Sequence, residues 1–237
     1  MQTVSDLYMD IIADKRHRKD VKILVDGVER PMGNIRSLKT YGSLFKTVGI
    51  GNVIAREIDM SFIPANEIPR TAEIRPYIRV RLGDQVSEWI PKGVFYIDTR
   101  KKDDSTGVLT IHGYDAILLH GGEVYLADGD VGTWPRAADV VVNDLAARFG
   151  VELDERTVIY PDILVSFPND WTCRELLGYI GVAHGGNWTV TDEGKLRMVP
   201  LWSIPDYDPD EPDTPETSLL IDESGNHITF GGVRIIV

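Results

Sequence analysis

The string His112-Gly113-Tyr114-Asp115 is the most enzyme-like feature of this 237-residue chain. An imidazole and a carboxylate this close in sequence could form a pair for general acid and base catalysis. The string follows an alternating strand pattern and precedes the apolar run 116–119. We therefore favour a structural interpretation, in which Gly113 ends the strand and Asp115 caps a short helical turn.

Cys173 is the only cysteine of the chain, so an internal disulfide is impossible. One cysteine and five scattered histidines also lack the paired spacing of a zinc site. Cys173 lies in the string Thr172-Cys173-Arg174-Glu175, which has the form of a capping box at the start of an amphipathic helix. Because no base can be identified, we interpret Cys173 as a buried structural residue rather than a nucleophile.

Carboxylates offer further candidates, all of them weak. The string Asp128-Gly129-Asp130 and the segment 206–216 could supply oxygen ligands to calcium, but neither matches the EF-hand pattern. Glu88 and Asp98 could be proposed as a glycosidase pair, yet no spacing rule selects them. The sequence contains no Gly-x-Ser-x-Gly, phosphate-loop or His-Glu-x-x-His motif. We therefore expect no catalytic, cofactor-binding or metal-binding residue, no cofactor and no enzyme activity.

The tryptophans could form either a binding surface or parts of the core. They are Trp89, Trp134, Trp171, Trp188 and Trp202. Exposed aromatic rings can bind sugars or partner proteins. Trp134 and Trp171 precede predicted helices and Trp89 precedes a predicted strand, where a large ring commonly packs the chain against its own element. We favour core or packing roles for all of them.

The charge balance argues against nucleic-acid binding. The chain has 25 Lys and Arg against 37 Asp and Glu, a net charge of -12 and a pI of about 4.8. Sequence-independent nucleic-acid binding needs cations that neutralise phosphates. The one basic cluster, residues 15–19, is assigned to the end of a helix, where cations suit the helix dipole. No apolar run approaches the roughly 20 residues of a membrane helix, so no membrane insertion is expected.

The first half of the chain predicts one helix followed by many short strands. The helix covers residues 3–18, where apolar residues recur at helical spacing and Thr3 or Ser5 can cap the start. Strands are predicted at 21–25, 33–40, 55–62, 77–82, 88–91, 93–98 and 107–113. Several short strands at this spacing suggest a closed or nearly closed β-barrel.

The second half of the chain predicts two helices and a hairpin. The first helix opens at Trp134-Pro135, with Thr133 as its cap and Gly150 as its stop. Its predicted buried residues are Ala138, Val141, Val142, Leu145 and Ala146. The second helix begins at Asp170 or Thr172, ends at Gly185-Gly186, and is expected to bury Leu176, Leu177, Ile180 and Val182. Strands are predicted at 157–160 and 163–167, and a hairpin at 187–201.

Residues 204–217 are acidic, proline-rich and almost free of aliphatic side chains. Such a segment cannot bury enough surface to become ordered by itself, so we interpret it as an extended loop. We expect a nonspecific protease to cut it before any core strand. The closing residues, near 218–221 and 227–237, are strand-like and end without a polar tail.

These patterns predict an α+β, mainly β chain with two β-rich subdomains. The predicted divisions are an N-terminal helix at 1–19, a first β-barrel subdomain at 20–120, a helical and β insertion at 121–186, and a second β-rich subdomain at 187–237 that includes 157–167. The boundary near 115–130 follows the clustered glycines and aspartates of that region.

Four strings resemble, in order, segments of the baseplate hub proteins of phage and prophage tails. They are Glu88 to Asp98, Leu109 to Ala116, Gly178 to Trp188, and Ile228 to Gly232, so the resemblance runs from about residue 20 to the end. It implies two tail-tube-like β-barrels and a homotrimer at the tip of the tail. Three chains with two barrels each could match the six-fold tail tube above and a three-fold spike or fibre below.

The resemblance implies a structural role in the virion tail or baseplate, after assembly in the cytoplasm of a bacterial host. Implied partners are the tail tube protein, distal tail and baseplate proteins, and the tip spike or fibre of a phage, prophage particle or tailocin. Many hub proteins continue into a spike-binding or peptidoglycan-degrading domain, for which this sequence supplies no residues. Two alternatives stay open: a six-fold distal tail adaptor or tube protein, and a tail-associated cell-wall hydrolase or carbohydrate-binding module.

Overall fold

The computed structural model describes residues 4–31, 34–46, 49–126, 132–201, 229–230 and 233–234. The chain divides into one unit over residues 1–201 and a second over residues 202–237. In the second unit, β14 (Thr229–Phe230) pairs antiparallel with β15 (Val233–Arg234). The calcium candidates Asp128 to Asp130, the segments 204–217 and 206–216, and Trp202 lie outside the described residues.

The N-terminal helix α1 (Asp6–Ala13) is shorter than the predicted 3–18. Ser5 is its cap, and the Ser5 hydroxyl accepts a hydrogen bond from the Tyr8 N–H. The helix stops because the Asp14 carboxylate accepts bonds from the backbone and guanidinium of Arg16, a local alternative to continued helix. The assignment of the basic cluster 15–19 to the helix end is therefore wrong, since its last residues already belong to the first strand.

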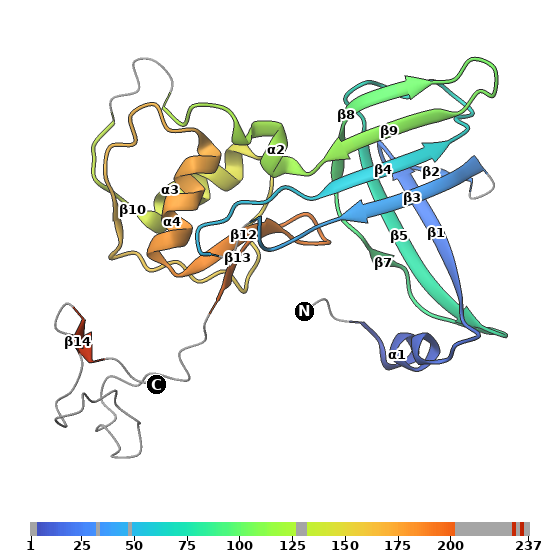
Figure 1. Cartoon of the computed structure of the whole chain (residues 1–237), viewed down its shortest axis with the longest axis horizontal. Helices are drawn as coiled ribbons and strands as arrows, with labels where there is room; N and C mark the ends of the chain where they lie inside the picture. The colour runs from blue at the N-terminus through green and yellow to red at the C-terminus, as the bar shows by residue number, and fades with distance from the viewer. Residues whose placement is uncertain are drawn as a thin grey trace. The chain divides into compact units, whose positions relative to one another are not determined.

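Nine strands of the first unit form one antiparallel sheet. Its members are β1 (Arg18–Val25), β2 (Val28–Arg30), β3 (Ile35–Tyr41), β4 (Glu57–Phe62), β5 (Glu73–Leu82), β6 (Gln85–Val86), β7 (Ile90–Pro91), β8 (Phe95–Lys102) and β9 (Leu109–Tyr114). The main order is β2-β1-β5-β8-β9-β4-β3, with β6 and β7 also paired to β5 (Figure 1).

Local sequence explains the tightest connection of this sheet. The β1–β2 hairpin turns at Asp26 and Gly27, whose φ angles of 49° and 75° are both positive. A two-residue turn of this kind matches the natural twist of the flanking strands and favours an Asp-Gly pair.

The sheet of the described residues is open, so the prediction of a closed barrel is wrong for this part of the chain. β2 and β3 end the strand order, and neither is paired with the other. Alternating short strands are compatible with an open sheet and with a barrel, because closure depends on a pairing between the two end strands that no local pattern encodes. Most of the predicted second barrel lies outside the described residues.

One face of the sheet carries its own core. Its buried residues alternate along the strands, as in Ile58, Met60 and Phe62 of β4. The full cluster is Ile23, Val25, Ile58, Met60, Phe62, Ile68, Ala72, Ile74, Phe95, Leu109 and Ile111. β1, β4, β5, β8 and β9 supply the strand residues of this core, and along β4 buried residues alternate with partly exposed ones.

The second group of elements contains three helices and a hairpin (Figure 1). The helices are α2 (Ala116–Gly121), α3 (Ala138–Arg148) and α4 (Cys173–Ala183), and β12 (Gly186–Val190) pairs with β13 (Leu196–Pro200). The short strands β10 (Arg136–Ala137) and β11 (Leu164–Val165) pair beside α3. The described part of the chain contains no helix that is long and apolar enough to cross a bilayer.

The predicted start of α3 is wrong, whereas its buried face is confirmed. The helix begins at Ala138, after an extended Ala137 that makes no side-chain cap. Ala137 pairs with Leu164 in the β10–β11 ladder, so tertiary pairing sets the start in place of Thr133. The five residues predicted to be buried are buried, and Gly150 follows the helix with a φ of 66°.

The predictions for α4 and the hairpin mostly hold. Thr172 and Glu175 form the expected capping box, and Leu176, Leu177 and Ile180 are buried. Val182 is 48% exposed, so its predicted burial is wrong. The hairpin is confirmed, while the predicted strands 157–160 and 163–167 reduce to β11, because regular backbone pairing is found there only at Leu164 and Val165 among the described residues.

A second core lies between these helices and the hairpin. Its buried members include Trp188 of β12, Phe149 after α3 and Leu176 of α4. Val53, which precedes β4, forms a parallel bridge with Trp188 and so belongs to this core as well. The chain leading into the sheet is thereby anchored to the helical elements.

Gly113 lies where β8 and β9 approach too closely for a side chain. The prediction that Gly113 ends a strand is wrong, since β9 continues through Tyr114. A Cβ at Gly113 would lie 2.5 Å from the Tyr96 carbonyl oxygen on β8. We expect Gly113→Ala to lower the free energy of unfolding by about 1–3 kcal/mol, because the backbone has to move. Gly122→Ala, where a Cβ meets nothing within 4 Å, is the control and should change the value by less than about 0.5 kcal/mol. Urea unfolding of both variants measures the difference, and equal values would contradict the steric account.

Candidate functional site

The structure does not bring His112 and Asp115 together as an acid–base pair. His112 Nδ1 lies 2.7 Å from Asp59 Oδ1, because these two residues face each other across β9 and β4. Asp115 is buried and is the N-cap of α2, as predicted. The carboxylates of Asp59 and Asp115 therefore occupy different environments, one partly exposed and one in the interior.

Asp115 joins the sheet to the helical elements. Its carboxylate accepts hydrogen bonds from the N–H groups of Arg56 at 2.8 Å and Ile117 at 3.0 Å. The Asp115 N–H in turn donates to the Arg56 carbonyl at 3.0 Å. Burial raises the pKa of Asp115 to about 6, against the opposing effect of these hydrogen bonds. The geometry is that of a structural clamp with both carboxylate oxygens engaged.

The remaining candidates from the sequence, Cys173, Glu88 and Asp98, lie in environments that suit structural roles. Cys173 is fully buried in the second core, and burial raises the pKa of its thiol, which disfavours the thiolate that a nucleophile requires. The Glu88 carboxylate accepts bonds from the N–H and hydroxyl of Ser5 at 2.7 and 2.6 Å, and these bonds lower its pKa. Asp98 lies at an irregularity of the β8–β9 register. Within the described residues, no group of three or more His, Cys, Asp or Glu side chains could hold a metal ion.

The described tryptophans lie in or against the protein itself. Trp188 is fully buried, and Trp134 and Trp171 pack half-buried against the second core. Trp89 is half-buried, with the Arg79 guanidinium 4.4 Å and the Lys22 ammonium 4.9 Å from its ring centroid. The core and packing roles predicted for these four residues are confirmed.

A polar cleft of about 480 Å³ lies between the β12–β13 hairpin and the chain around the ends of β3 and β4. Hydroxyl groups line part of it, from Thr40, Ser43, Thr189 and Thr191. Charged side chains line the rest: Arg56, Lys92, Arg156, Arg197, Asp192 and Glu193. Residues distant in sequence thus converge on one concave surface.

One wall of the cleft is an ion-pair network. Arg56 Nη1 lies 2.6 Å from Asp192 Oδ1, and Lys92 Nζ lies 3.4 Å from Asp192 Oδ2. The side chains of Arg56 and Asp192 are only 16% and 19% exposed. Since Asp192 belongs to the hairpin turn and the two cations flank sheet strands, the network links the sheet to the hairpin.

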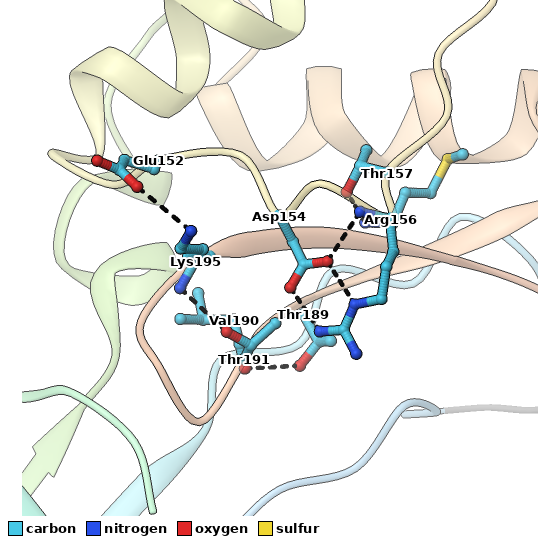
Figure 2. Close-up of polar contacts among 9 residues, drawn as sticks. Glu152, Asp154, Arg156, Thr157, Thr189, Val190, Thr191 and Lys195 are labelled. Atoms are coloured by element: carbon cyan, nitrogen blue, oxygen red, sulfur yellow. Dashed lines mark hydrogen bonds and ion pairs between the residues drawn. The ribbon is translucent and has the colours of Figure 1, made fainter. Parts of the chain in front are cut away.

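Arg156, which also lines the cleft, belongs to the loop 152–157 beside β13 (Figure 2). The Asp154 carboxylate binds Arg156 at two points, 2.7 and 2.6 Å, and these bonds lower the pKa of Asp154 to about 2. The loop is held to the strand by the Asp154 N–H, which donates to the Leu196 carbonyl, and by the Met198 N–H, which donates to the Thr157 hydroxyl. The guanidinium of Arg156 is therefore placed by local bonds before any partner arrives.

Asp192→Ala tests the ion-pair wall. The change leaves Arg56 and Lys92 without their shared carboxylate, so we expect the free energy of unfolding to fall by about 2 kcal/mol, between the values of exposed and fully buried pairs. Lys195→Ala is the matched control on the same hairpin, because its 3.4 Å pair with Glu152 is largely exposed. The control should lose less than about 1 kcal/mol. Thermal or urea unfolding measures both, and a control loss equal to that of Asp192→Ala would refute the difference in burial.

A second concave region, of about 730 Å³, lies between α2 and α4. Leu118 of α2 and Tyr179 and Val182 of α4 line it and are exposed. Val182 lies so close to Gly51 that a side chain at Gly51 would clash with it. This region is more apolar than the polar cleft.

Sequence reasoning missed the residues of the polar cleft. In the sequence, Asp192 lies within the predicted hairpin 187–201 and Arg56 within the predicted strand 55–62. Their pairing joins segments far apart in the chain, and no local pattern at either position predicts it.

One known protein of low sequence identity shows the same fold, and another is similar. No protein-family model and no curated protein matches the chain. A solved structure, the prophage MuSo2 43 kDa tail protein from Shewanella oneidensis, is similar with a TM-score of 0.53 and 14% identity over 77% of this chain. The tail protein from Neisseria meningitidis MC58 gives a TM-score of 0.49 and 16% identity, covering 85% of this chain and 62% of that one. This chain spans 53% of the Shewanella protein, and the likeness to that protein establishes a shared fold.

Proposed function

We propose that this chain is a structural component of a phage tail or phage-tail-like particle. The observation that carries the proposal is the fold shared with the Shewanella prophage tail protein over 77% of the chain. His112 pairs with Asp59 and Asp115 accepts a bond from the Arg56 N–H, so the two residues do not form an acid–base pair. This arrangement is compatible with a structural role. Fold alone does not assign chemistry, so the assembly itself is the property to test.

Within the tail, we propose the role of a baseplate hub, a homotrimer that adapts the six-fold tail tube to a three-fold spike or fibre. In this arrangement residues 20–120 and 187–237, with 157–167, form the two barrel-like subdomains and 121–186 the insertion. The hydrophobic cluster around Ile58 supports a packing centre for the first subdomain, whereas the cluster around Trp188 joins the hairpin to the insertion. A net charge of -12 suits a ring through which DNA passes without adhering, since like charges repel.

The molar mass of the purified protein in solution tests the hub. Light scattering over a range of concentrations should give three times the 26.5 kDa of one chain. Six times that mass would replace the hub by a distal tail adaptor or a tube protein. A strict monomer, with no trimer on adding the tail tube protein, would refute the hub.

A carbohydrate-binding or hydrolytic role finds less support. Such a module needs an open aromatic platform or a cleft with paired carboxylates. Trp188 is fully buried and the ring of Trp89 carries two cations, so neither supplies an open platform. We therefore propose a structural partner-binding role in place of an enzymatic one.

A further inference from the structure

The polar cleft between the hairpin and the sheet contains more cationic than anionic side chains. Arg56, Lys92, Arg156 and Arg197 line it, from four separate segments of the chain. Two carboxylates pair with three of these cations: Asp192 pairs with Arg56 and Lys92, and Asp154 pairs with Arg156. The one further carboxylate on the lining is Glu193, which is exposed at the hairpin turn. A local cationic excess in a chain of net charge -12 calls for a functional explanation.

Arg197 is the cation of the cleft with an unused donor. Its Nε atom is buried and has no hydrogen-bond partner among the described residues. Buried donors are nearly always satisfied, and a guanidinium N–H is satisfied best by a carboxylate or phosphate oxygen. Arg197 and Thr189 are paired across the β12–β13 ladder and both line the cleft, so a cationic and a hydroxyl side chain share this wall. An anion in the cleft would lie close to the charge of this guanidinium.

The size and shape of the cleft favour a peptide over a small ion. Its volume of about 480 Å³ lies within the range of sites that enclose a drug-sized ligand, roughly 300–1,000 Å³. Two guanidinium groups of the cleft lining, those of Arg56 and Arg156, are held by Asp192 and Asp154 and therefore need no reordering on binding. Guanidinium groups suit carboxylates and phosphates alike, so competition between the two kinds of anion has to separate them.

We propose that this cleft binds an acidic segment of a neighbouring protein in the particle, with its carboxylates on Arg197 and the adjoining cations. The inference deepens the proposed function by naming the chemistry of one contact, and it rests on that function for the identity of the neighbour. It places Arg197 and Thr189 as contacts of the partner, and Glu193 as a carboxylate at the rim that weakens binding by repulsion.

The test uses the full chain and a fluorescent, end-capped hexaglutamate peptide, followed by fluorescence anisotropy. Binding of this probe to a protein of net charge -12 has to come from a local cationic surface. We expect saturable binding that weakens as the salt concentration rises, and none of an end-capped hexaglutamine peptide. Absence of hexaglutamate binding would overturn the proposal, as would equal binding of the two peptides.

Variants locate the contact. Arg197→Gln should weaken hexaglutamate binding at least tenfold, whereas Lys195→Gln, a cation of the same hairpin that is paired with Glu152 outside the cleft lining, should change it less than twofold. Glu193→Gln should tighten binding about threefold, a gain that a folding defect cannot produce. Unchanged binding in Arg197→Gln would overturn the proposal, and so would equal losses in Arg197→Gln and Lys195→Gln.

Two competitors separate the proposed partner from other anions. Inorganic phosphate and a hexathymidylate oligonucleotide should displace the peptide only at much higher concentrations. If either binds as tightly as hexaglutamate through Arg197, the site is one for phosphate or nucleic acid and the proposal fails. Light scattering of the same variants reports the trimer separately, so loss of peptide binding with an intact trimer mass removes the cleft contact and leaves the proposed hub standing.

Discussion

Trp188→Ala should lower the free energy of unfolding by about 3–5 kcal/mol, the usual cost of truncating a fully buried aromatic residue. Trp188 is 0% exposed and is the largest fully buried side chain of the described residues. The backbone N–H of Trp188 donates to the Asn52 carbonyl at 2.8 Å, and its strand bridges to Val53. The cavity would open where the helices, the hairpin and the chain entering the sheet all meet, so the surroundings have little freedom to collapse.

Urea unfolding followed by far-ultraviolet circular dichroism measures this loss without relying on tryptophan fluorescence. Trp171→Ala is the control, because Trp171 is half-buried and stacks on Tyr179 with ring centroids 4.2 Å apart. The control should lose about 1 kcal/mol, the order of an aromatic pair at the surface. A loss below about 1 kcal/mol for Trp188→Ala would contradict the assignment of this residue to the core.

Asp115→Ala should lower the free energy of unfolding by about 2–5 kcal/mol, because it leaves the N–H groups of Arg56 and Ile117 without their acceptor. Both donors lie where the sheet meets α2, so water cannot replace the carboxylate without opening the structure. The change removes a helix cap at the same time. Urea unfolding at pH 7 checks the value, and a loss under about 0.5 kcal/mol would show that the clamp is dispensable.

The raised pKa of Asp115, about 6, adds a pH dependence with a definite sign. An aspartate of the unfolded chain titrates near about 3.9, so between these values the folded protein holds a proton that the unfolded chain has released. The free energy of unfolding therefore falls as the pH rises from about 4 to about 6, and the contribution of Asp115 is fully present only below that window.

Asp115→Asn removes this titration. The free energy of unfolding of the wild type minus that of Asp115→Asn should be larger at pH 4.5 than at pH 7, by about 1–2 kcal/mol at about 1.4 kcal/mol per unit of pKa. Urea unfolding at the two pH values measures it. A difference that is the same at both, or larger at pH 7, would mean that burial does not raise the pKa of Asp115.

Local sequence was sufficient for the caps, turns and buried faces of individual elements. Asp115, Thr172 with Glu175, and Gly150 act within a few residues of their own positions, and all three assignments are confirmed. The buried face of α3 follows equally well from the 3.6-residue period. Each of these features depends on contacts along one turn or one helix face, and such contacts can be predicted from the local sequence.

Other local expectations were wrong where distant pairing competes with the local pattern. The first helix was predicted to reach residue 18, yet it ends at Ala13, and β1 begins at Arg18 because its residues pair with β5 over the full length of the strand. Thr133 is a suitable cap, but Ala137 is held in the β10–β11 ladder. In both cases hydrogen bonds to another strand outweigh a weak helical preference.

The sequence by itself determined the mainly β character, the amphipathic helices, the hairpin and the acidic balance of the chain. Only the tertiary structure decided that the described sheet stays open, that His112 faces Asp59 instead of Asp115, and that Arg56 meets Asp192. The physical reason is the range of the interactions. Caps and periodic faces arise between near neighbours in the chain, whereas strand order and the polar cleft arise from segments that become neighbours only after the chain has folded.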